Sequence, residues 1–569
     1  MIHQPDRAES KVSIPPRTPH RIPRAGRAAR RSTAALLALA CLAPPASRAG
    51  SLRLSEGLPF SDVDHSSATR PLVSADGRFA VYVHDAVVDH AKELWSVPVA
   101  GGDPIRLSGL FPSPASPIQL ALTPDAQTAV YLAPQDSTDV YELYSAPIAG
   151  PEGSWIRLNQ TLVAFGDVAE FVLAPDGGRV AYVADAQTDG IFDVWSVPVA
   201  GGTAIRLRPT ITADGSTAFP QYLRVSADGS RVAFHANFSD LGELDLWSAR
   251  LDGTGGVHRL SGDLAEGSPV QNDFAFSPDG ARVVYRAAGE TPGKVELHSV
   301  PAAGGSAPVR LNGTLPAAGD VMGFVFSPDG SRVVYLADQQ VDERFELYTV
   351  PVTGGTPVPL NGPLVAGGDI PRGDFAVAPD GARVVYRADQ AEDERFELYS
   401  VPLTGGAAVK LNGALDVGGD ILDFAFTPDG SRVVYRGDQQ TDGAFELYAV
   451  PVAGGAAVRV SDPLVPGGRV FSGYSISPDG SHVAYLADRE FASRVELSRA
   501  PIAGGDDDDV RMSGDLVALG DVADFVLHPD GSRALYVADQ EVRTRDDLYV
   551  GDPCLLCDAF ESGDLRRWD

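Results

Sequence analysis

The feature that most constrains the fold is a turn sequence, Ser-Pro-Asp-Gly or a close variant of it, that recurs ten times along the chain. Its aspartates follow one another at intervals of 49 to 52 residues. They are Asp76, Asp125, Asp176, Asp228, Asp279, Asp329, Asp380, Asp429, Asp479 and Asp530. A repeat of this length indicates that one supersecondary unit stacks against copies of itself.

Each unit reads as four short strands. Around Asp429, an apolar run at 423–427 leads into Pro428-Asp429-Gly430, where Pro and Gly favour a type I turn. The segments 432–436, 445–450 and 458–461 are rich in β-branched and aromatic residues or alternate in polarity, as strands do. Four strands in about 50 residues, with no helical periodicity, predict an all-β fold in which each unit is a propeller blade.

The polarity of the strands agrees with blades that stack face to face. The run Val433-Val434-Tyr435 is continuously apolar, as expected of a strand covered on both faces. The fourth strands, such as 205–207 and 409–411, alternate between apolar and charged residues, as expected of a half-exposed strand at the outside.

The strand count predicts how the ring closes. Residues 52–55 resemble the fourth strand of a blade, whereas the last unit ends at residue 550 without its own fourth strand. We therefore expect the N-terminal strand to complete the C-terminal blade, which leaves no open sheet edge. The even spacing favours one ring of ten blades. Two smaller rings in series remain an alternative, because propellers usually have about 4 to 8 blades.

The segment 1–49 differs from the rest of the chain. It is basic, carries an apolar stretch at 34–43 and ends in Ser47-Arg48-Ala49, which is typical of a secretory signal peptide. The apolar stretch is too short to span a bilayer. The sequence thus predicts an exported protein (periplasmic, cell-surface or secreted) with a signal peptide at 1–49, a propeller at 50–550 and a tail at 551–569. The alternatives are a disordered basic arm and a lipid anchor at Cys41.

The net charge and the number of cysteines limit the kinds of partner and cofactor that the chain is expected to have. Without the first 49 residues the chain keeps 37 basic and 74 acidic residues, and so repels the phosphate backbone of nucleic acids. No transmembrane segment is expected after signal cleavage. Only Cys554 and Cys557 then remain, and a local disulfide is the simplest expectation for them in an exported protein. A redox pair or half of a zinc site is the alternative.

The repeat unit resembles the TolB-like propeller repeat, also called the WD-type "PD" repeat. The resemblance rests on Phe326-Ser327-Pro328-Asp329-Gly330, on 332–335, on 346–348 and on Gly354-Gly355, and it recurs from about residue 52 to 550. It implies the propeller fold. The α/β domain that precedes the propeller in TolB has no counterpart here, so a role in the Tol system is not implied.

No catalytic residues are predicted. A serine hydrolase needs Gly-x-Ser-x-Gly at a strand-to-helix turn, and the nearest match, Gly473 to Ser477, lacks the final glycine. A second candidate for chemistry is a histidine group formed by His65, His84 and His90 with Asp85 and Asp89. Such a group could hold a transition metal, but its spacing matches no metal motif, and ordinary surface histidines are favoured.

The remaining candidate sites are acidic. The connections between second and third strands, and those between blades, both carry aspartates and are expected on the same rim of a propeller. Asp369, Asp389, Asp420 and Asp438 are candidate calcium ligands there. Capping of turns by these side chains is the favoured alternative, in which case no cofactor is needed. The repeated turn itself assigns a structural role to Asp279, Asp329, Asp380, Asp429 and Asp479.

The function expected from these observations is that of an exported, non-enzymatic scaffold that binds a protein or a carbohydrate on its loop rim. The alternatives are a propeller-based polysaccharide lyase or glycosidase, which would need two suitably spaced carboxylates, and a purely structural envelope protein. Specific recognition is expected where units depart from the common pattern, at 214–223, 235–246 and 287–295.

Overall fold

The structure is a computed structural model. It describes residues 50–552 except for 56–62, 64–69, 89–90, 112–118, 136, 138–139, 210–221, 239–243, 263, 265–268, 289–292, 506–508 and 544. The described residues form forty strands in ten antiparallel sheets of four, and no helix. The predicted signal peptide, Cys41, Cys554 and Cys557 lie outside the described residues, so these remain predictions.

The strands fall into four sets by their position in the sheets. The innermost strands are β2 (Leu72–Val73), β6 (Gln119–Leu122), β10 (Val168–Leu173), β14 (Arg224–Val225), β18 (Ala275–Phe276), β22 (Val321–Phe326), β26 (Phe375–Val377), β30 (Ile421–Phe426), β34 (Ser475–Ile476) and β38 (Val522–Leu527). The second strands are β3 (Phe79–Val88), β7 (Thr128–Ala133), β11 (Arg179–Ala184), β15 (Arg231–Ala236), β19 (Arg282–Ala288), β23 (Arg332–Ala337), β27 (Arg383–Ala388), β31 (Arg432–Gly437), β35 (His482–Ala487) and β39 (Ala534–Ala538).

The third strands are β4 (Ala91–Pro98), β8 (Glu142–Pro147), β12 (Asp193–Pro198), β16 (Asp245–Arg250), β20 (Val295–Pro301), β24 (Glu346–Pro351), β28 (Glu397–Pro402), β32 (Glu446–Pro451), β36 (Glu496–Pro501) and β40 (Asp547–Asp552). The outer strands are β5 (Ile105–Arg106), β9 (Ile156–Arg157), β13 (Ile205–Arg206), β17 (Val257–Arg259), β21 (Val309–Arg310), β25 (Val358–Pro359), β29 (Val409–Lys410), β33 (Val458–Arg459), β37 (Val510–Arg511) and β1 (Gly50–Arg53).

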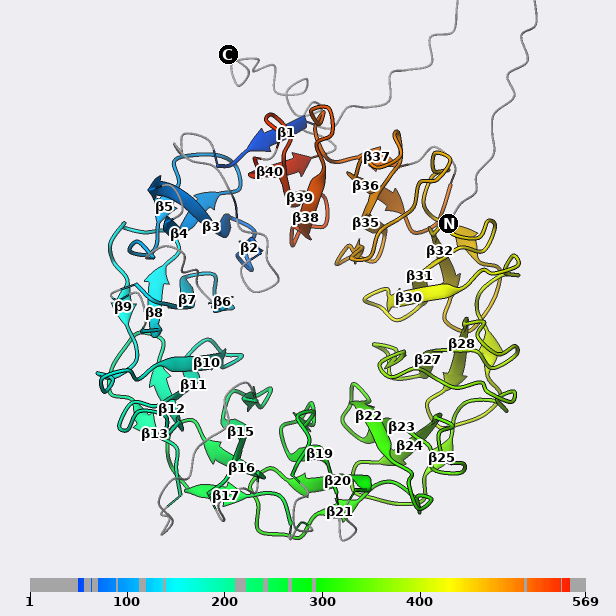
Figure 1. Cartoon of the computed structure of the whole chain (residues 1–569), viewed down its shortest axis with the longest axis horizontal. Coiled ribbons are helices and arrows are strands. Elements are labelled where there is room, and N and C mark those ends of the chain that lie inside the picture. The colour runs from blue at the N-terminus through cyan, green and yellow to red at the C-terminus, as the bar shows by residue number, and fades with distance from the viewer. Residues whose placement is uncertain are drawn as a thin grey trace, which may run out of the picture. The chain divides into compact units, whose positions relative to one another are not determined.

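The ten sheets stand as blades around one ring, with their innermost strands toward the centre (Figure 1). We number the blades along the chain, from blade 1 (β2–β5) to blade 9 (β34–β37). Blade 10 consists of β38, β39, β40 and the N-terminal strand β1, which pairs with β40 from Gly50 opposite Asp552 to Arg53 opposite Tyr549. The predictions of ten blades, one ring and closure by the N-terminal strand are confirmed, and the alternative of two rings is wrong.

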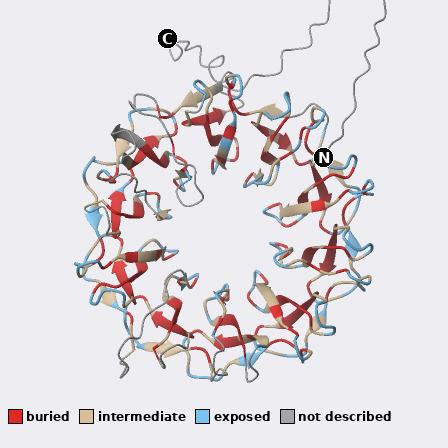
Figure 2. Cartoon of the chain, in the orientation of Figure 1, coloured by how far each residue is buried: buried red, intermediate tan, exposed pale blue. Residues whose placement is uncertain are grey.

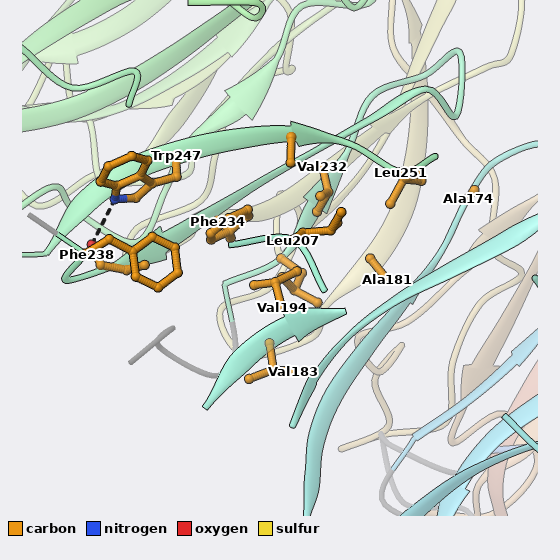
Figure 3. Packing of buried hydrophobic residues seen from close by; sticks show 13 residues of the cluster. Ala174, Ala181, Val183, Val194, Leu207, Val232, Phe234, Phe238, Trp247 and Leu251 are labelled. Carbon is orange, nitrogen blue, oxygen red and sulfur yellow. Dashed lines mark hydrogen bonds between the residues drawn. The ribbon is translucent and has the colours of Figure 1, made fainter. Parts of the chain in front are cut away.

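Blades are held together by apolar side chains on their faces. The second and third strands are almost entirely buried, whereas the innermost strands are only half-buried beside the central channel (Figure 2). Between blades 3 and 4, Val183 and Val194 pack with Val232, Phe234 and Trp247 (Figure 3). Burial of each large apolar side chain contributes about 1.5–3 kcal/mol. The continuous apolar runs of the second strands therefore supply the cohesion between neighbouring blades.

The ring closes at a seam within blade 10, where β1 meets β40 without a covalent link. Arg53 on β1 lies 2.6 Å from Asp547 on β40, and Ser55 donates to the same carboxylate at 2.8 Å. Arg545 contacts the second oxygen of Asp547 at 2.9 Å. His528, in the last repeated turn, lies 2.7 Å from the carbonyl oxygen of Gly77 in the first. The seam thus relies on one buried carboxylate and on backbone pairing.

Candidate functional site: the junction rim

The loops form two rims. The repeated Pro-Asp-Gly turns join first to second strands, and the turns that join third to outer strands lie on the same side. We call the opposite side the junction rim; it carries the connections from second to third strands and the connections between blades. Hydrogen bonds join these two kinds of connection, as in the 2.5 Å bond from the Asp420 amide to Asp438. The prediction that their aspartates share a rim agrees with this geometry.

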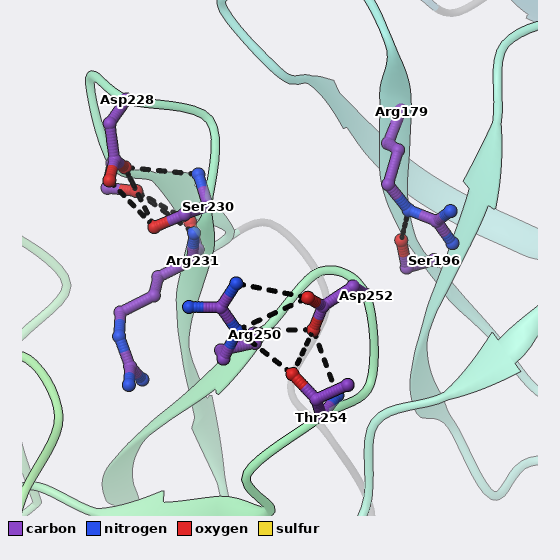
Figure 4. Close-up of polar contacts among 9 residues, drawn as sticks. Arg179, Ser196, Asp228, Ser230, Arg231, Arg250, Asp252 and Thr254 are labelled. Carbon is purple, nitrogen blue, oxygen red and sulfur yellow. Dashed lines mark hydrogen bonds and ion pairs between the residues drawn. The ribbon is translucent and has the colours of Figure 1, made fainter.

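The repeated turns hold their aspartates in a structural role. In the turn of blade 6, the Ser327 hydroxyl donates to Asp329 at 2.6 Å and the Ser331 amide donates to it at 3.0 Å. The same bonds occur at Asp228 (Figure 4), Asp279 and Asp479. In the turn of Asp380, Ala378 stands where other turns have a serine and so offers no hydroxyl. Asp380 accepts a hydrogen bond from the Ala382 amide at 2.9 Å.

These bonds also set the ionisation of the turn. The hydroxyl of Thr427, together with the amide of Ser431, lowers the pKa of Asp429 to about 2. The hydroxyl of Ser327 likewise lowers the pKa of Asp329. Asp329 and Asp429 are therefore ionised caps and not candidate proton donors.

The four candidate calcium ligands form two separate pairs on consecutive blades. In blade 7, Asp389 accepts the Asp369 amide at 2.6 Å on one oxygen and the Glu394 amide at 3.0 Å on the other. In blade 8, Asp438 accepts the Asp420 amide at 2.5 Å and the Gly443 amide at 2.9 Å. The carboxylates of Asp389 and Asp438 thus have both oxygens engaged by backbone N–H groups.

The aspartates of the inter-blade connections clasp neighbouring blades together. Asp420 donates its amide to Asp438 of blade 8, and its carboxylate accepts the amide of Phe396 of blade 7 at 2.8 Å. Asp167, Asp320 and Asp521 accept in the same way from Tyr141, Val295 and Val495. Each of these hydrogen bonds joins two neighbouring blades, so these aspartates stabilise the ring.

Asp369 differs from its counterparts. Burial raises its pKa, and three neighbouring carboxylates raise it further. These neighbours are Asp389, Asp393 and Glu394. Within the part of the chain that the structure describes, no group of three or more His, Cys, Asp or Glu side chains is arranged to hold a metal ion.

We expect millimolar Ca²⁺ to raise the melting temperature no more than NaCl at equal ionic strength, because backbone amides already occupy the oxygens of Asp389 and Asp438. Differential scanning calorimetry in the two salts measures this. An occupied site would add about 2.7 kcal/mol at 100 times its dissociation constant. A larger shift in Ca²⁺ that disappeared in Asp369→Asn would show that the calcium alternative is right.

A glycine precedes the aspartate in the inter-blade connections, because the backbone of another connection lies too close there for a side chain. A Cβ on Gly419 would lie 2.8 Å from the carbonyl oxygen of Asp438, and one on Gly520 would lie 2.6 Å from that of Asp539. Real Cβ atoms do not approach backbone so closely. The Gly-Asp pairs found in the sequence at the junctions therefore mark where one connection lies directly on another.

Gly419→Ala is expected to lower the free energy of unfolding by about 1–3 kcal/mol, as overpacking does. Gly323→Ala is its control, because a Cβ there meets nothing within 4 Å and neither glycine has a positive φ. Urea unfolding of the two variants measures the difference. Equal stability of the two would show that the connection can shift without cost.

Buried carboxylates at the start of the third strands are paired with cations of the outer strands. Glu397 lies 2.8 Å from Lys410, and Asp193 lies 2.5 Å from Arg206 and 3.0 Å from Arg208. Glu142, Asp245 and Glu446 pair with Arg157, Arg259 and Arg459 in the same manner. These pairs explain the charged residues of the five outer strands β9, β13, β17, β29 and β33.

Asp509 is the carboxylate whose ionisation is most changed toward neutrality. Burial raises its pKa to about 6, and it accepts hydrogen bonds from the Tyr485 hydroxyl and, at 2.9 Å, from the Asp462 amide. In blade 8 a glutamine makes the equivalent bonds: Gln439 accepts from Tyr435 and from the Gly413 amide. Asp509 thus makes in blade 9 the hydrogen bonds that a glutamine makes in blade 8. The sequence indicates this exchange at Arg489, which stands where other blades have that glutamine.

The histidine group is placed only in part. His84 is fully buried, so the expectation of a surface histidine is wrong for this residue. His65, Asp89 and His90 lie outside the described residues, and the side chain of Asp85 is not described. Most of 214–223, the loop 239–243 and the loop 289–292 are also outside them, so recognition at those segments stays a prediction.

No family model matches the sequence, and no curated protein matches it. Solved structures with a similar fold include a protein described as TolB from Agrobacterium tumefaciens, which is 18% identical, with 45% of this chain and 83% of that chain covered and a TM-score of 0.27. Dipeptidyl peptidase 4 of Porphyromonas gingivalis is 11% identical, with 84% and 65% covered and a TM-score of 0.46. An oligogalacturonate lyase in complex with manganese is 13% identical, with 71% and 98% covered and a TM-score of 0.33. At these identities the similarity concerns the fold alone.

Proposed function

We propose that the chain is an exported, non-enzymatic propeller that binds a protein or a carbohydrate on its junction rim. The observation that carries the proposal is the contrast between the two levels of that rim. Its deeper carboxylates, such as Asp389 and Asp438, are engaged by backbone amides, whereas its loop tips expose side chains that differ from blade to blade. Loops whose bases are fixed by the same hydrogen bonds, and whose exposed ends differ in sequence, are suited to recognising a ligand.

Support for a non-enzymatic role comes from how the titratable groups are used. The buried carboxylates of the third strands are held in ion pairs, and Asp509 replaces a structural glutamine. No helix of the described residues has the length and apolar character needed to cross a membrane. The engagement of these carboxylates favours a scaffold that presents a surface.

Screening the purified chain from residue 50 on glycan and protein arrays tests the proposal. We expect a ligand that binds reproducibly, without turnover, and that loses binding when tips of the junction rim are altered. Release of new ends from a polysaccharide, with loss of that activity in Asp509→Asn, would overturn the non-enzymatic role.

Export is tested separately. Expressed with its first 49 residues in a Gram-negative host, the protein is expected outside the cytoplasm with an N-terminus near Gly50, as the small residues Ser47 and Ala49 favour cleavage there. Intact mass spectrometry of the exported material measures this. Exported protein that retains Met1 would contradict the assignment.

A further inference from the structure

Large apolar side chains are exposed at the tips of the junction rim, and they gather on blades 9 and 10. Phe491 is 57% exposed in the loop between β35 and β36, and Val542 is 47% exposed in the corresponding loop of blade 10. Leu519, on the connection from blade 9 to blade 10, is 67% exposed. The same rim also exposes Phe165, Val341 and Val417, but among the described residues only blades 9 and 10 carry such side chains on three successive loops. Contiguous exposed apolar patches mark interaction sites.

Hydrogen bonds place these three loops side by side. Arg494 of blade 9 lies over the ring of Phe491 and donates to the carbonyl oxygen of Leu516 on the connection at 3.2 Å. On its other side, the connection donates from the Val517 amide to the carbonyl oxygen of Gln540 of blade 10 at 3.1 Å. The connection that carries Leu519 is therefore clamped between the loops that carry Phe491 and Val542.

The loops of a blade can form without large apolar side chains at the positions of Phe491, Leu519 and Val542. Leu519 has a φ of 65°, a left-handed conformation that is unfavourable for a residue with a Cβ. The equivalent positions of blades 7 and 8 are Gly367 and Gly418, with φ of 89° and 86°. At the positions of Phe491 and Val542, blade 8 has Thr441. At these three positions blades 7 and 8 thus have residues other than large apolar ones, and the loops still form.

The neighbouring loops of blades 7 and 8 are acidic. Five of their carboxylates are exposed, namely Glu392, Asp393, Glu394, Asp416 and Asp442. Among the described residues of these loops Arg395 is the one cation, and it is already engaged by Glu392 at 3.0 Å and by the carbonyl oxygen of Leu415 at 2.6 Å. The next connection, from blade 8 to blade 9, carries the exposed Arg469. Val417, 88% exposed, lies among them. The apolar tips of blades 9 and 10 thus continue into a negatively charged arc.

We propose that the junction rim of blades 7 to 10 is the docking surface for a polypeptide segment that carries apolar side chains next to lysines or arginines. Phe491, Leu519 and Val542 take the apolar side chains, and the carboxylates of blades 7 and 8 take the cations. The proposal rests on the proposed function and specifies its ligand class. Charge complementarity selects this occupant, since an acidic glycan or nucleic acid would be repelled by the same arc.

The test uses three labelled synthetic peptides of 20 residues and fluorescence polarisation. One peptide joins a Leu/Phe-rich half to a Lys-rich half, the second has Glu in place of Lys, and the third has Ser in place of Leu and Phe. We expect the first to bind at least tenfold more tightly than the other two. Its affinity should fall as salt is raised, because the cations contribute through exposed charges.

Variants locate the binding. Phe491→Thr, Leu519→Gly and Val542→Thr together introduce the residues of blade 8, and are expected to weaken binding of the first peptide at least tenfold without lowering the melting temperature. The control is Phe165→Gly with Val341→Thr, which removes exposed apolar side chains from blades 3 and 6 of the same rim. It should change the affinity less than twofold. Glu392→Gln, Asp393→Asn and Glu394→Gln together should reduce the salt dependence.

The outcomes separate this inference from the proposed function. Equal binding by the triple variant and its control, or equal binding of the Ser-containing peptide, would overturn the docking surface. A glycan that binds the wild-type protein while no peptide does would overturn the polypeptide ligand but keep the binding function. A wild-type protein that binds nothing on either array would overturn both.

Discussion

Replacing Asp547 with alanine is expected to lower the free energy of unfolding by about 3 kcal/mol or more and to loosen the ring at its seam. The carboxylate is buried and holds Arg53, Ser55 and Arg545 at once. Removing one partner of a buried ion pair leaves the other charge uncompensated, which typically costs 3–5 kcal/mol. Urea unfolding measures the loss, and hydrogen exchange of residues 50–53 reports the seam.

Asp245→Ala is the matched control for this change. Asp245 opens the third strand of blade 4, is equally buried, and pairs with Arg259 and Ser261. Its partners belong to the same continuous hairpin, whereas those of Asp547 include a strand about 490 residues away in sequence. We expect both variants to lose stability and only Asp547→Ala to expose β1 to exchange. Equal protection of β1 in the two variants would show that backbone pairing alone closes the ring.

Lowering the pH from 6.5 to 4 is expected to destabilise the fold through two buried histidines and one half-buried histidine. Burial lowers the pKa of His84, His235 and His298 to about 4 each. Each is therefore neutral in the folded protein and takes up its proton in the unfolded chain near pH 6.5. Unfolding then binds protons across this window, so stability falls as the pH falls, by about 3 kcal/mol for each histidine at the acid end.

One carboxylate opposes this trend. Asp509, with a pKa of about 6, binds its proton in the folded protein before it does so in the unfolded chain, which adds stability below pH 6. His298→Tyr isolates one histidine, because Tyr348 stacks on Tyr335 in blade 6 as His298 stacks on Tyr285. Urea midpoints from pH 7 to 4.5 should decline less steeply in this variant. Identical slopes would show that His298 does not titrate in this window.

The sequence predicted what depends on local chemistry. The Pro-Asp-Gly turns, the four strands around Asp429 and the incomplete last unit were sufficient for ten blades and for closure by residues near Leu52. It also placed Asp420 and Asp438 on one rim. It could not show that the Asp420 carboxylate accepts the amide of Phe396, because a backbone donor from a neighbouring blade leaves no mark on residue identity.

The wrong prediction for His84 and the failure to single out Leu519 have the same physical cause. His84 was expected at the surface because the spacing of its group matches no metal motif, yet the structure buries it completely. Leu519 belongs to none of the sites predicted from the sequence, and its positive φ and its exposure set it apart. In both cases the decisive property is the contact, or lack of contact, with another blade.

The closing strand also imposes an order of events on biosynthesis. The strand β1 leaves the ribosome first among the blade elements, whereas its partner β40 lies about 490 residues later in the chain. At about 5–20 residues per second, the waiting time is roughly half a minute to two minutes. Throughout that time the first strand has no native partner, while successive blades can form behind it. Whatever protects this segment from pairing with another chain during the delay governs how much of the protein matures into closed rings.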